Sequence, residues 1–157
     1  MFALVIGIDT YKSKDIKDLS GAVADAQAFT TYLHDQLSVP QDHLTILENE
    51  AATRLAILEE LRRFANDPRI QHGNPIVVFY AGHGSEAAAP FGWEAGGPDA
   101  KIQLILPYDV DFDSRDEVFA SIPDRTFGAL LAAISQEKGN NIVSTAKIPS
   151  LCLPDHF

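Results

Sequence analysis

The sequence predicts an α/β fold, a three-layer sandwich in which a mostly parallel β-sheet lies between helices on both faces. Short apolar runs alternate along the chain with longer segments whose apolar residues recur at helical spacing, which is the pattern of βαβ units. The first run, residues 2–8, is apolar at nearly every position, as is typical of parallel strands that are covered on both faces. Polar turns follow two of the runs, and sites in parallel sheets lie at such strand ends.

The composition indicates one domain and excludes several kinds of partner. The 157 residues are enough for a single hydrophobic core. A net charge of −10 argues against nucleic acids and anionic membranes as partners. No apolar run is long enough to span a bilayer, and the N-terminus lacks the basic segment and cleavage site of a signal peptide. A single cysteine, Cys152, excludes a disulfide framework within the chain, and we predict a cytoplasmic location.

The first part of the chain predicts a strand, a helix and a second strand. Residues 2–8 form the first strand. Ser20 is expected to cap a helix over residues 21–37, because its hydroxyl can accept a backbone N–H at the helix start. A short second strand is predicted over residues 43–47. The apolar stripe of the helix consists of Ala22, Ala26, Phe29, Leu33 and Leu37.

The middle of the chain predicts a second helix followed by a third buried strand. Thr53 is expected to cap the helix, which ends near Asn66. Glu59 and Arg63 lie one turn apart on it and are expected to form an ion pair. The third strand covers residues 75–80 and is again almost continuously apolar.

The remainder predicts a long loop, a strand, an acidic loop and a third helix. Residues 86–100 are rich in glycine, alanine and proline, and residues 102–106 form the fourth strand. An acidic loop follows over residues 109–117. Asp124 is expected to cap the third helix, which Gly139 ends.

Two predicted strands end in polar, glycine-containing turns that are candidates for a functional site, at residues 7–11 and 81–85. The second turn places His83 between Gly82 and Gly84. Glycine lets the backbone turn sharply and lets another chain approach closely, and imidazole is the most frequent general acid or base in enzymes. A loop histidine without a catalytic role is the alternative. No His/Cys/Asp group in the sequence has the spacing of metal ligands. The other histidines, expected on surfaces, in loops and in the tail, are His34, His43, His72 and His156.

Three ordered motifs resemble those of the caspase-like cysteine peptidases, and most closely those of the metacaspase branch. They are ALVIGIDTY at residues 3–11, LSGAVADA at residues 19–26 and VVFYAGHG at residues 77–84. The resemblance covers residues 2–142. It implies a caspase-haemoglobinase fold, endopeptidase chemistry by a Cys–His dyad, and a role in proteolysis linked to programmed cell death.

The resemblance assigns His83 as the catalytic histidine. A thiol with an ordinary pKa of ~8.5 needs a neighbouring base to become a thiolate, and His83 would be that general acid and base. Gly82 and Gly84 would form the turn on the oxyanion side of the site.

The resemblance also suggests a substrate-binding subsite for basic residues. Asp25 matches the acidic residue that receives Arg or Lys of the substrate in metacaspases, and residues 19–21 lack the arginine by which caspases proper bind aspartate. The alternative role of Asp25 is a first-turn carboxylate that complements the helix dipole, worth about 0.3–1 kcal/mol. Ala81 lies where many metacaspases have a serine in the substrate pocket. The expected partner is therefore a protein or peptide with basic residues.

No cofactor is expected. Many metacaspases need calcium, but the paired aspartates of that site correspond here to Asp124 and Arg125, and a cation beside a calcium ligand is unfavourable. The alternating Asp109, Asp111 and Asp113 could bind a hard cation such as calcium, but they lack the glycine and glutamate of an EF-hand loop. We interpret them as a solvated acidic loop and predict no metal site.

The resemblance ends where the family carries its nucleophile, in a motif of the type Asp-Cys/Ser-Cys-His-Ser-Gly. Residues 140–142 fit the start of the preceding strand, but no such motif follows Val143. Cys152 lies in a proline-bounded tail without the expected neighbours, and is expected to pack as a small apolar residue. We therefore predict a caspase-like domain over residues 1–142 that is incomplete at its C-terminal side, a divergent tail over residues 143–157, and no catalytic cysteine in this chain.

The break suggests a hypothesis about its genetic origin and has a structural consequence. Val143-Ser144 is what a common intron donor sequence encodes when it is read in frame, so residues 143–157 are hypothesised to derive from a retained intron or a gene-model error. The strand beside residues 75–80 would then be missing or replaced by the tail, and an unpaired central strand would make the domain marginally stable.

Two functions follow as hypotheses. The first is a metacaspase-like endopeptidase domain that prefers Arg or Lys. The second is an inactive caspase-like decoy or interaction module that binds a caspase-like paralogue. A nucleotide-binding domain is disfavoured, because residues 7–12 lack a glycine-rich phosphate loop.

Overall fold

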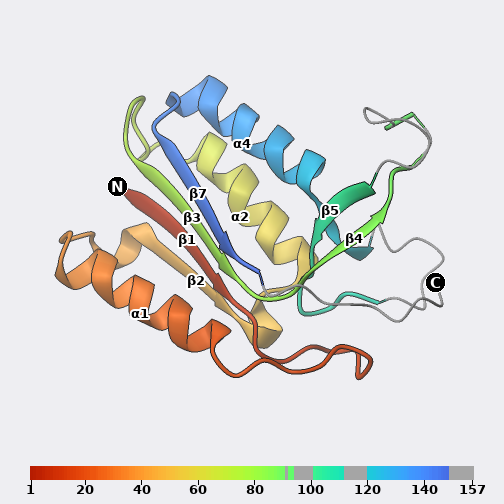
Figure 1. Cartoon of the computed structure of the whole chain (residues 1–157). Helices are drawn as coiled ribbons and strands as arrows, with labels where there is room; N and C mark the ends of the chain where they lie inside the picture. Colours follow the sequence, from red (N-terminus) through yellow and green to blue (C-terminus); the bar gives the residue numbers. More distant parts are fainter. Residues whose placement is uncertain (91, 94–100, 112–119, 149–157) are drawn as a thin grey trace.

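The computed structural model of the chain describes residues 1–90, 92–93, 101–111 and 120–148. Its centre is a four-stranded parallel sheet in the order β2-β1-β3-β7 (Figure 1). One face of this sheet packs against α1, and the other packs against α2 and α4. The predicted three-layer α/β architecture is therefore confirmed. The strands are β1 (Phe2–Gly7), β2 (Leu44–Glu48), β3 (Ile76–Ala81) and β7 (Ile142–Lys147), and the helices are α1 (Ala22–Asp35), α2 (Arg54–Asn66) and α4 (Asp124–Lys138).

A second, antiparallel sheet was not predicted. It consists of β4 (Gly84–Ala88), β5 (Lys101–Ile105) and β6 (Ile122–Pro123), in that order. The sequence predicted a loop from residue 86 and gave no partner for the strand at residues 102–106. Gly-Ser-Glu-Ala-Ala has little strand propensity of its own, so β4 depends on backbone pairing with β5. Much of the predicted loop, residues 91 and 94–100, lies outside the described residues.

The start of α1 is capped by a residue distant in sequence, and the predicted cap Ser20 is wrong. Gly21 occupies the N-cap position without a side-chain cap. The carboxylate of Asp9, just past β1, instead accepts the N–H groups of Gly21 (3.0 Å), Ala22 (2.8 Å) and Val23 (3.3 Å). A carboxylate satisfies several N–H groups at once and its charge complements the helix dipole, which a serine hydroxyl cannot do. Asp9 thereby joins β1 to α1.

The start of α2 confirms one prediction and corrects another. The Thr53 hydroxyl accepts the N–H of Ala56 at 3.2 Å, as expected of a cap. Asp109 Oδ1 accepts the N–H of Arg54 at 2.7 Å. Asp109 is therefore a second cap on this helix and not part of a solvated acidic loop, because the helix start leaves several N–H groups to satisfy.

The end of α2 carries an ion-pair network that differs from the predicted Glu59–Arg63 pair. Arg63 reaches Glu60 at 2.6 Å and Asp67 at 3.0 Å. Asp67 also binds Arg69 at 2.7 Å. The predicted pair is wrong because Asp67 and Glu60 lie on the side of the helix that faces β2, where Arg63 also donates to a β2 threonine.

Asp67 gives the fold a pH dependence that can be measured. The hydrogen bonds from Arg69 lower the pKa of its buried carboxyl from 3.8 to about 2. A depressed pKa in the folded state adds stability above the unfolded value, and this stability is lost as pH falls from about 4 to about 2. Asp67→Asn should therefore lower the urea midpoint at neutral pH and have little effect near pH 2.

A matched control is Glu59→Gln, which removes an exposed carboxylate from the same helix. Its midpoint should follow that of the unsubstituted chain at every pH. An Asp67→Asn effect of equal size at neutral and acidic pH would show that the network does not act through the charge of this carboxylate.

The ends of α4 agree with the prediction at one side only. Gly139 ends the helix with φ of 86°, a left-handed conformation that favours glycine. At the start, Pro123 is the N-cap and Asp124 is already the first helical residue, so Asp124 is not the predicted cap. Proline in the extended N-cap conformation begins this helix one residue earlier than expected.

Strand β7 completes the central sheet where the sequence predicted a break. It pairs with β3 in parallel along its whole length, from Ile76↔Ile142 to Ala81↔Lys147. Of the two expected alternatives, a missing strand or one replaced by the tail, the second holds. An unpaired β3 is therefore a wrong expectation, because β7 pairs with it and becomes an edge of the described sheet, with β2 at the other edge and Val143 of β7 58% exposed.

The helices of the described segments carry no membrane span. None combines the length and the apolar content that a bilayer crossing requires.

Candidate active site

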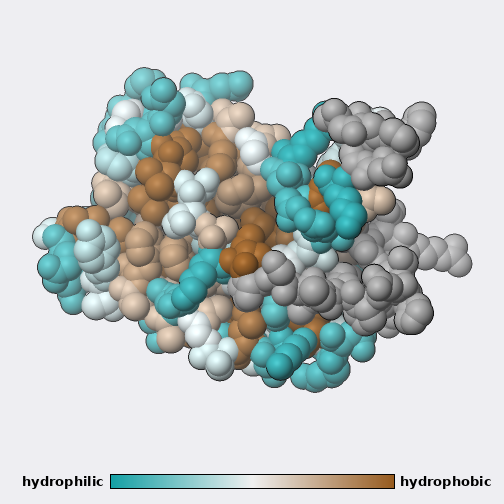
Figure 2. Space-filling view, viewed as in Figure 1, coloured by the Kyte–Doolittle hydropathy of each residue, from teal (hydrophilic) through white to brown (hydrophobic). Residues whose placement is uncertain are grey.

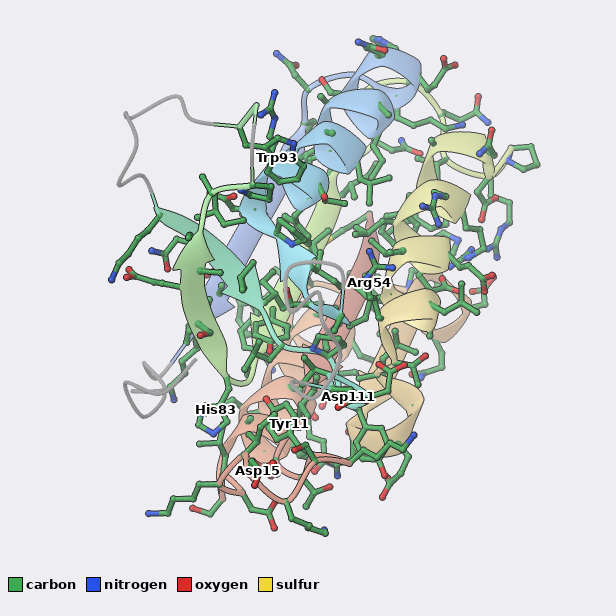
Figure 3. All side chains as sticks on the ribbon, turned by 90° about the vertical axis from the view of Figure 1, so that its right-hand side faces the viewer. Tyr11, Asp15, Arg54, His83, Trp93 and Asp111 are labelled. Atoms are coloured by element: carbon green, nitrogen blue, oxygen red, sulfur yellow. The ribbon has the colours of Figure 1, made fainter. Side chains whose placement is uncertain are left out.

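The two turns singled out in the sequence meet at the carboxyl end of the parallel sheet. Gly7 and Ala81 are register partners at the ends of β1 and β3, so the segments that follow them start side by side. Tyr11 and His83 lie next to each other there, with ring centroids 5.4 Å apart (Figure 3). The structure thus brings together two motifs that lie about half the chain apart in the sequence.

The imidazole of His83 is buried and held on one side. The residue is 5% exposed, and its Nε2 lies 2.8 Å from the backbone oxygen of Lys17. A carbonyl can only accept, so Nε2 carries the proton and Nδ1 of the neutral ring is a free acceptor. Nδ1 is buried and has no hydrogen-bond partner among the described residues. The geometry leaves one bare ring nitrogen available to take a proton.

Two tyrosine hydroxyls hold the peptide groups of His83. Tyr11 Oη accepts the His83 N–H at 2.7 Å, and Tyr80 Oη donates to the His83 oxygen at 2.7 Å. Burial raises the pKa of Tyr11 to about 12 and the pKa of Tyr80 well above its ordinary value, so both hydroxyls keep their protons at neutral pH. The sequence analysis missed both residues, although each lies in a quoted motif and next to a turn.

The glycines on either side of His83 are required by space. A Cβ on Gly82 would lie 2.6 Å from Tyr80 Oη and 3.1 Å from Tyr11 Oη. A Cβ on Gly84 would lie 2.6 Å from a methyl carbon of Ile148 and 3.1 Å from the Leu104 oxygen. These contacts explain why both positions need glycine, whereas the turn and oxyanion role of the two glycines stays a prediction.

Asp25 lies in the first turn of α1 and already has a cationic partner. Lys147 Nζ is 2.6 Å from Asp25 Oδ2, with the two side chains 69% and 37% exposed. The backbone oxygen of Lys147 also accepts the Gly82 N–H at 3.4 Å. Asp25 therefore lies at the same carboxyl end of the parallel strands as residues 81–85, the His83 turn. Ala81 is buried as the last residue of β3, and its substrate-binding role stays a prediction.

A largely apolar cavity of about 280 Å³ lies behind the turn, between β5, β7 and α4. Gly84, Leu104, Phe127 and Ile148 line it together with Tyr80. In Figure 2 the brown, apolar surface at the centre of this face is interrupted by paler and teal residues, and the exposed large apolar residues at β7 and just after it are Val143 (58%) and Ile148 (43%).

The described residues contain no group of three or more His, Cys, Asp or Glu side chains that could hold a metal ion. Asp109 serves α2 as a cap, and Asp113 lies outside the described residues. Cys152 lies outside them as well.

Comparisons with known proteins identify the family. The family model described as "Caspase domain" (Peptidase_C14) matches residues 1–133. Metacaspase-1A of Aspergillus oryzae (strain ATCC 42149 / RIB 40) is 28% identical over 116 residues, which is 70% of this chain and 26% of the relative. The crystal structure of protein GSU0716 from Geobacter sulfurreducens matches with a TM-score of 0.67 at 18% identity, covering 95% of this chain and 49% of that one.

The chain thus spans about a quarter of the length of its curated relative and about half of the solved structure. The solved structure supports the fold, and the family match extends over most of the described sheet and its turns. The chain belongs to the caspase domain family, as a metacaspase-like member.

Proposed function

We propose that this chain is the histidine-bearing part of a cysteine endopeptidase domain that cleaves after Arg or Lys. The observation that carries the proposal is the His83 ring, whose Nε2 is held by the Lys17 carbonyl while Nδ1 stays bare and buried at the end of the parallel sheet. In the reaction, the proton of a cysteine thiol passes to Nδ1, and the resulting thiolate attacks the peptide carbonyl. His83 then returns the proton to the leaving amine, while the Lys17 carbonyl stabilises the intervening imidazolium.

The thiol is the part of the centre that this sequence does not supply in recognisable form. No Asp-Cys-Cys-His-Ser motif occurs in the 157 residues, and Cys152 is the single cysteine. At the end of β7, beside the His83 turn, the chain carries Lys147 and Ile148. We therefore expect no turnover of peptides by the chain as printed.

The source of the thiol is tested by the intact mass of the native protein. A mass above 17.1 kDa, with peptides that run from Ile142 into a Cys-His-Ser motif, would support the peptidase. A mass near 17.1 kDa, with the peptide of residues 143–157 present, would contradict catalysis by this product.

A second candidate function is an inactive caspase-like module that binds a caspase-like paralogue. The observation that favours it is the open edge of β7, with Val143 58% exposed and backbone groups free to pair on that side within the described sheet. The two candidates differ in their dependence on His83. A His83→Gln substitution would abolish turnover in the peptidase and leave paralogue binding unchanged in the module.

The proposed subsite for basic residues can be tested without any thiol. A fluorescent peptide that ends in arginine amide should bind the chain through Asp25, and Asp25→Asn should abolish this binding. Lys147 competes for the same carboxylate. An exposed pair contributes up to about 1 kcal/mol, so Lys147→Gln should lower the Kd by up to about fivefold.

Two controls make the result specific to this carboxylate. The same peptide with norleucine amide in place of arginine amide should not bind. Lys101→Gln removes another exposed lysine, which pairs with Glu86, and should leave the Kd unchanged. Equal affinity of the Asp25→Asn variant for the arginine peptide would remove Asp25 from the subsite.

A further inference from the structure

We propose that Tyr11 and Tyr80 are positioning residues for His83. Their hydroxyl groups fix the peptide groups of the histidine, and this keeps Nε2 of its ring on the Lys17 carbonyl and leaves Nδ1 free. The inference rests on the proposed function of His83 as the base.

The argument begins with the backbone of His83, which lies beyond the end of β3 and outside the ladder of the parallel sheet. A buried N–H and C=O at such a position need other partners. The N–H finds Tyr11 Oη at 2.7 Å. The oxygen accepts from Tyr80 Oη at 2.7 Å and from the Leu106 N–H at 3.1 Å. Side-chain hydroxyls therefore replace the missing strand neighbours.

The hydroxyl groups of Tyr11 and Tyr80 also pack against Gly82, the residue before His83. Both approach the α-carbon of Gly82 so closely that a Cβ there would lie 2.6 Å from one and 3.1 Å from the other. Tyr80 Oη lies in addition 2.9 Å from the Leu106 oxygen, which ties the turn to the end of β5. Both tyrosine rings are 2% exposed. The His83 peptide groups are therefore buried in a network of hydrogen bonds and have little freedom to move.

Tyr11 links the contact that holds the His83 backbone to the contact that holds its ring. It belongs to the segment between β1 and α1, which also contains Lys17, whose oxygen holds Nε2 at 2.8 Å. That segment is attached to the rest of the fold at Lys12, whose N–H donates to the Tyr108 oxygen. The Tyr11 hydroxyl therefore sets the distance between the His83 backbone and the Lys17 carbonyl, which accepts the hydrogen bond from the His83 ring. Loss of this hydroxyl loosens the backbone and the ring partner together.

A purely structural role for the tyrosines makes a different prediction. Phenylalanine keeps the ring and its packing and removes only the hydroxyl. If the rings alone matter, Tyr→Phe changes nothing at the imidazole. If the hydroxyls position the histidine, Tyr→Phe changes which ring nitrogen carries the proton, because the Nε2–carbonyl contact is what selects the tautomer.

The experiment records the imidazole ¹⁵N and ring ¹H NMR signals of the whole ¹⁵N-labelled chain at a pH where His83 is neutral. The His83 signals are assigned by their loss in His83→Gln. The unsubstituted chain should show a single tautomer, with Nε2 protonated and Nδ1 bare. Tyr11→Phe should give a mixture of tautomers and faster exchange of the His83 amide proton. Tyr80→Phe should shift the population in the same direction by a smaller amount, because the Leu106 N–H still holds the His83 oxygen.

Tyr32→Phe is the matched control, because this tyrosine is about half exposed on α1 and should leave the His83 signals unchanged. A single Nε2-protonated tautomer in both Tyr11→Phe and Tyr80→Phe would overturn the inference, whatever their stability. If Tyr11→Phe does not fold, Tyr80→Phe decides alone, and an unchanged tautomer there overturns the inference. A His83 protonated on Nδ1 in the unsubstituted chain would instead contradict the proposed function.

Discussion

Replacing Gly82 with alanine is expected to destabilise the fold by about 2–3 kcal/mol, the upper range of costs for an overpacked core. The new Cβ would lie 2.6 Å from Tyr80 Oη and 3.1 Å from Tyr11 Oη, well inside contact distance. Both rings are buried among packed neighbours, so neither can move away without opening space elsewhere. The hydrogen bonds of both hydroxyls to the His83 backbone would break at the same time.

Urea unfolding followed by circular dichroism measures this change. Gly21→Ala is the control, because a Cβ on Gly21 meets no atom within 4 Å. Because Gly21 is the N-cap of α1, the variant should lose at most about 1 kcal/mol, the ordinary cost of alanine at this position, and clearly less than Gly82→Ala. A Gly82→Ala chain of unchanged stability would mean that the two tyrosines are not held as tightly as their hydrogen bonds indicate.

Gly7→Ala should destabilise the chain by about 2 kcal/mol for a different reason. Gly7 is the last residue of β1, and a Cβ there would lie 2.7 Å from Ala26 Cβ and 2.9 Å from the Ala22 oxygen. The obstacle is the α1 backbone itself, which cannot give way as a flexible side chain can. The helix would have to move away from the sheet, and the hydrogen bonds that join Asp9 to the helix start would lengthen with it.

Gly128→Ala provides the opposite result from the same chemical change. Gly128 lies within α4, and its Cβ would meet no atom within 4 Å. Alanine in a helix interior is preferred over glycine by about 0.5–1 kcal/mol, so this variant should be more stable than the unsubstituted chain. Two glycine-to-alanine changes with opposite signs separate the effect of space from that of backbone propensity. Equal effects would argue against the close packing of α1 on β1.

The parts of the fold that follow from local pattern were predictable. Continuous apolar runs identified β1 and β3, Thr53 and Gly139 marked ends of helices, and the glycines around His83 indicated a turn at a strand end. Each of these signals comes from a residue and its immediate neighbours, which a single sequence contains.

The parts that depend on distant partners were not predictable. Asp9 caps a helix 12 to 14 residues further on, in competition with a nearer serine that has the better local pattern. Strand β4 exists because β5 pairs with it, since its own residues have weak strand propensity. In the site, the partner of the His83 ring is a backbone oxygen of Lys17, and any residue there would supply the same atom. Asp25 and Lys147, 122 residues apart, meet only through the register of β7.

The position of β7 at the end of the described chain determines when the site can form during synthesis. The β3 strand and the His83 turn are made some sixty residues before the strand that pairs with them. Parallel pairing over such a separation is slow, because the entropy cost of closing a long loop precedes the stabilising contacts between the strands. A nascent chain that has just passed β3 therefore carries an apolar strand with one side open, which is a binding site for chaperones and a hazard for aggregation. We expect the Asp25–Lys147 contact to be among the last to form, so its appearance marks the end of folding.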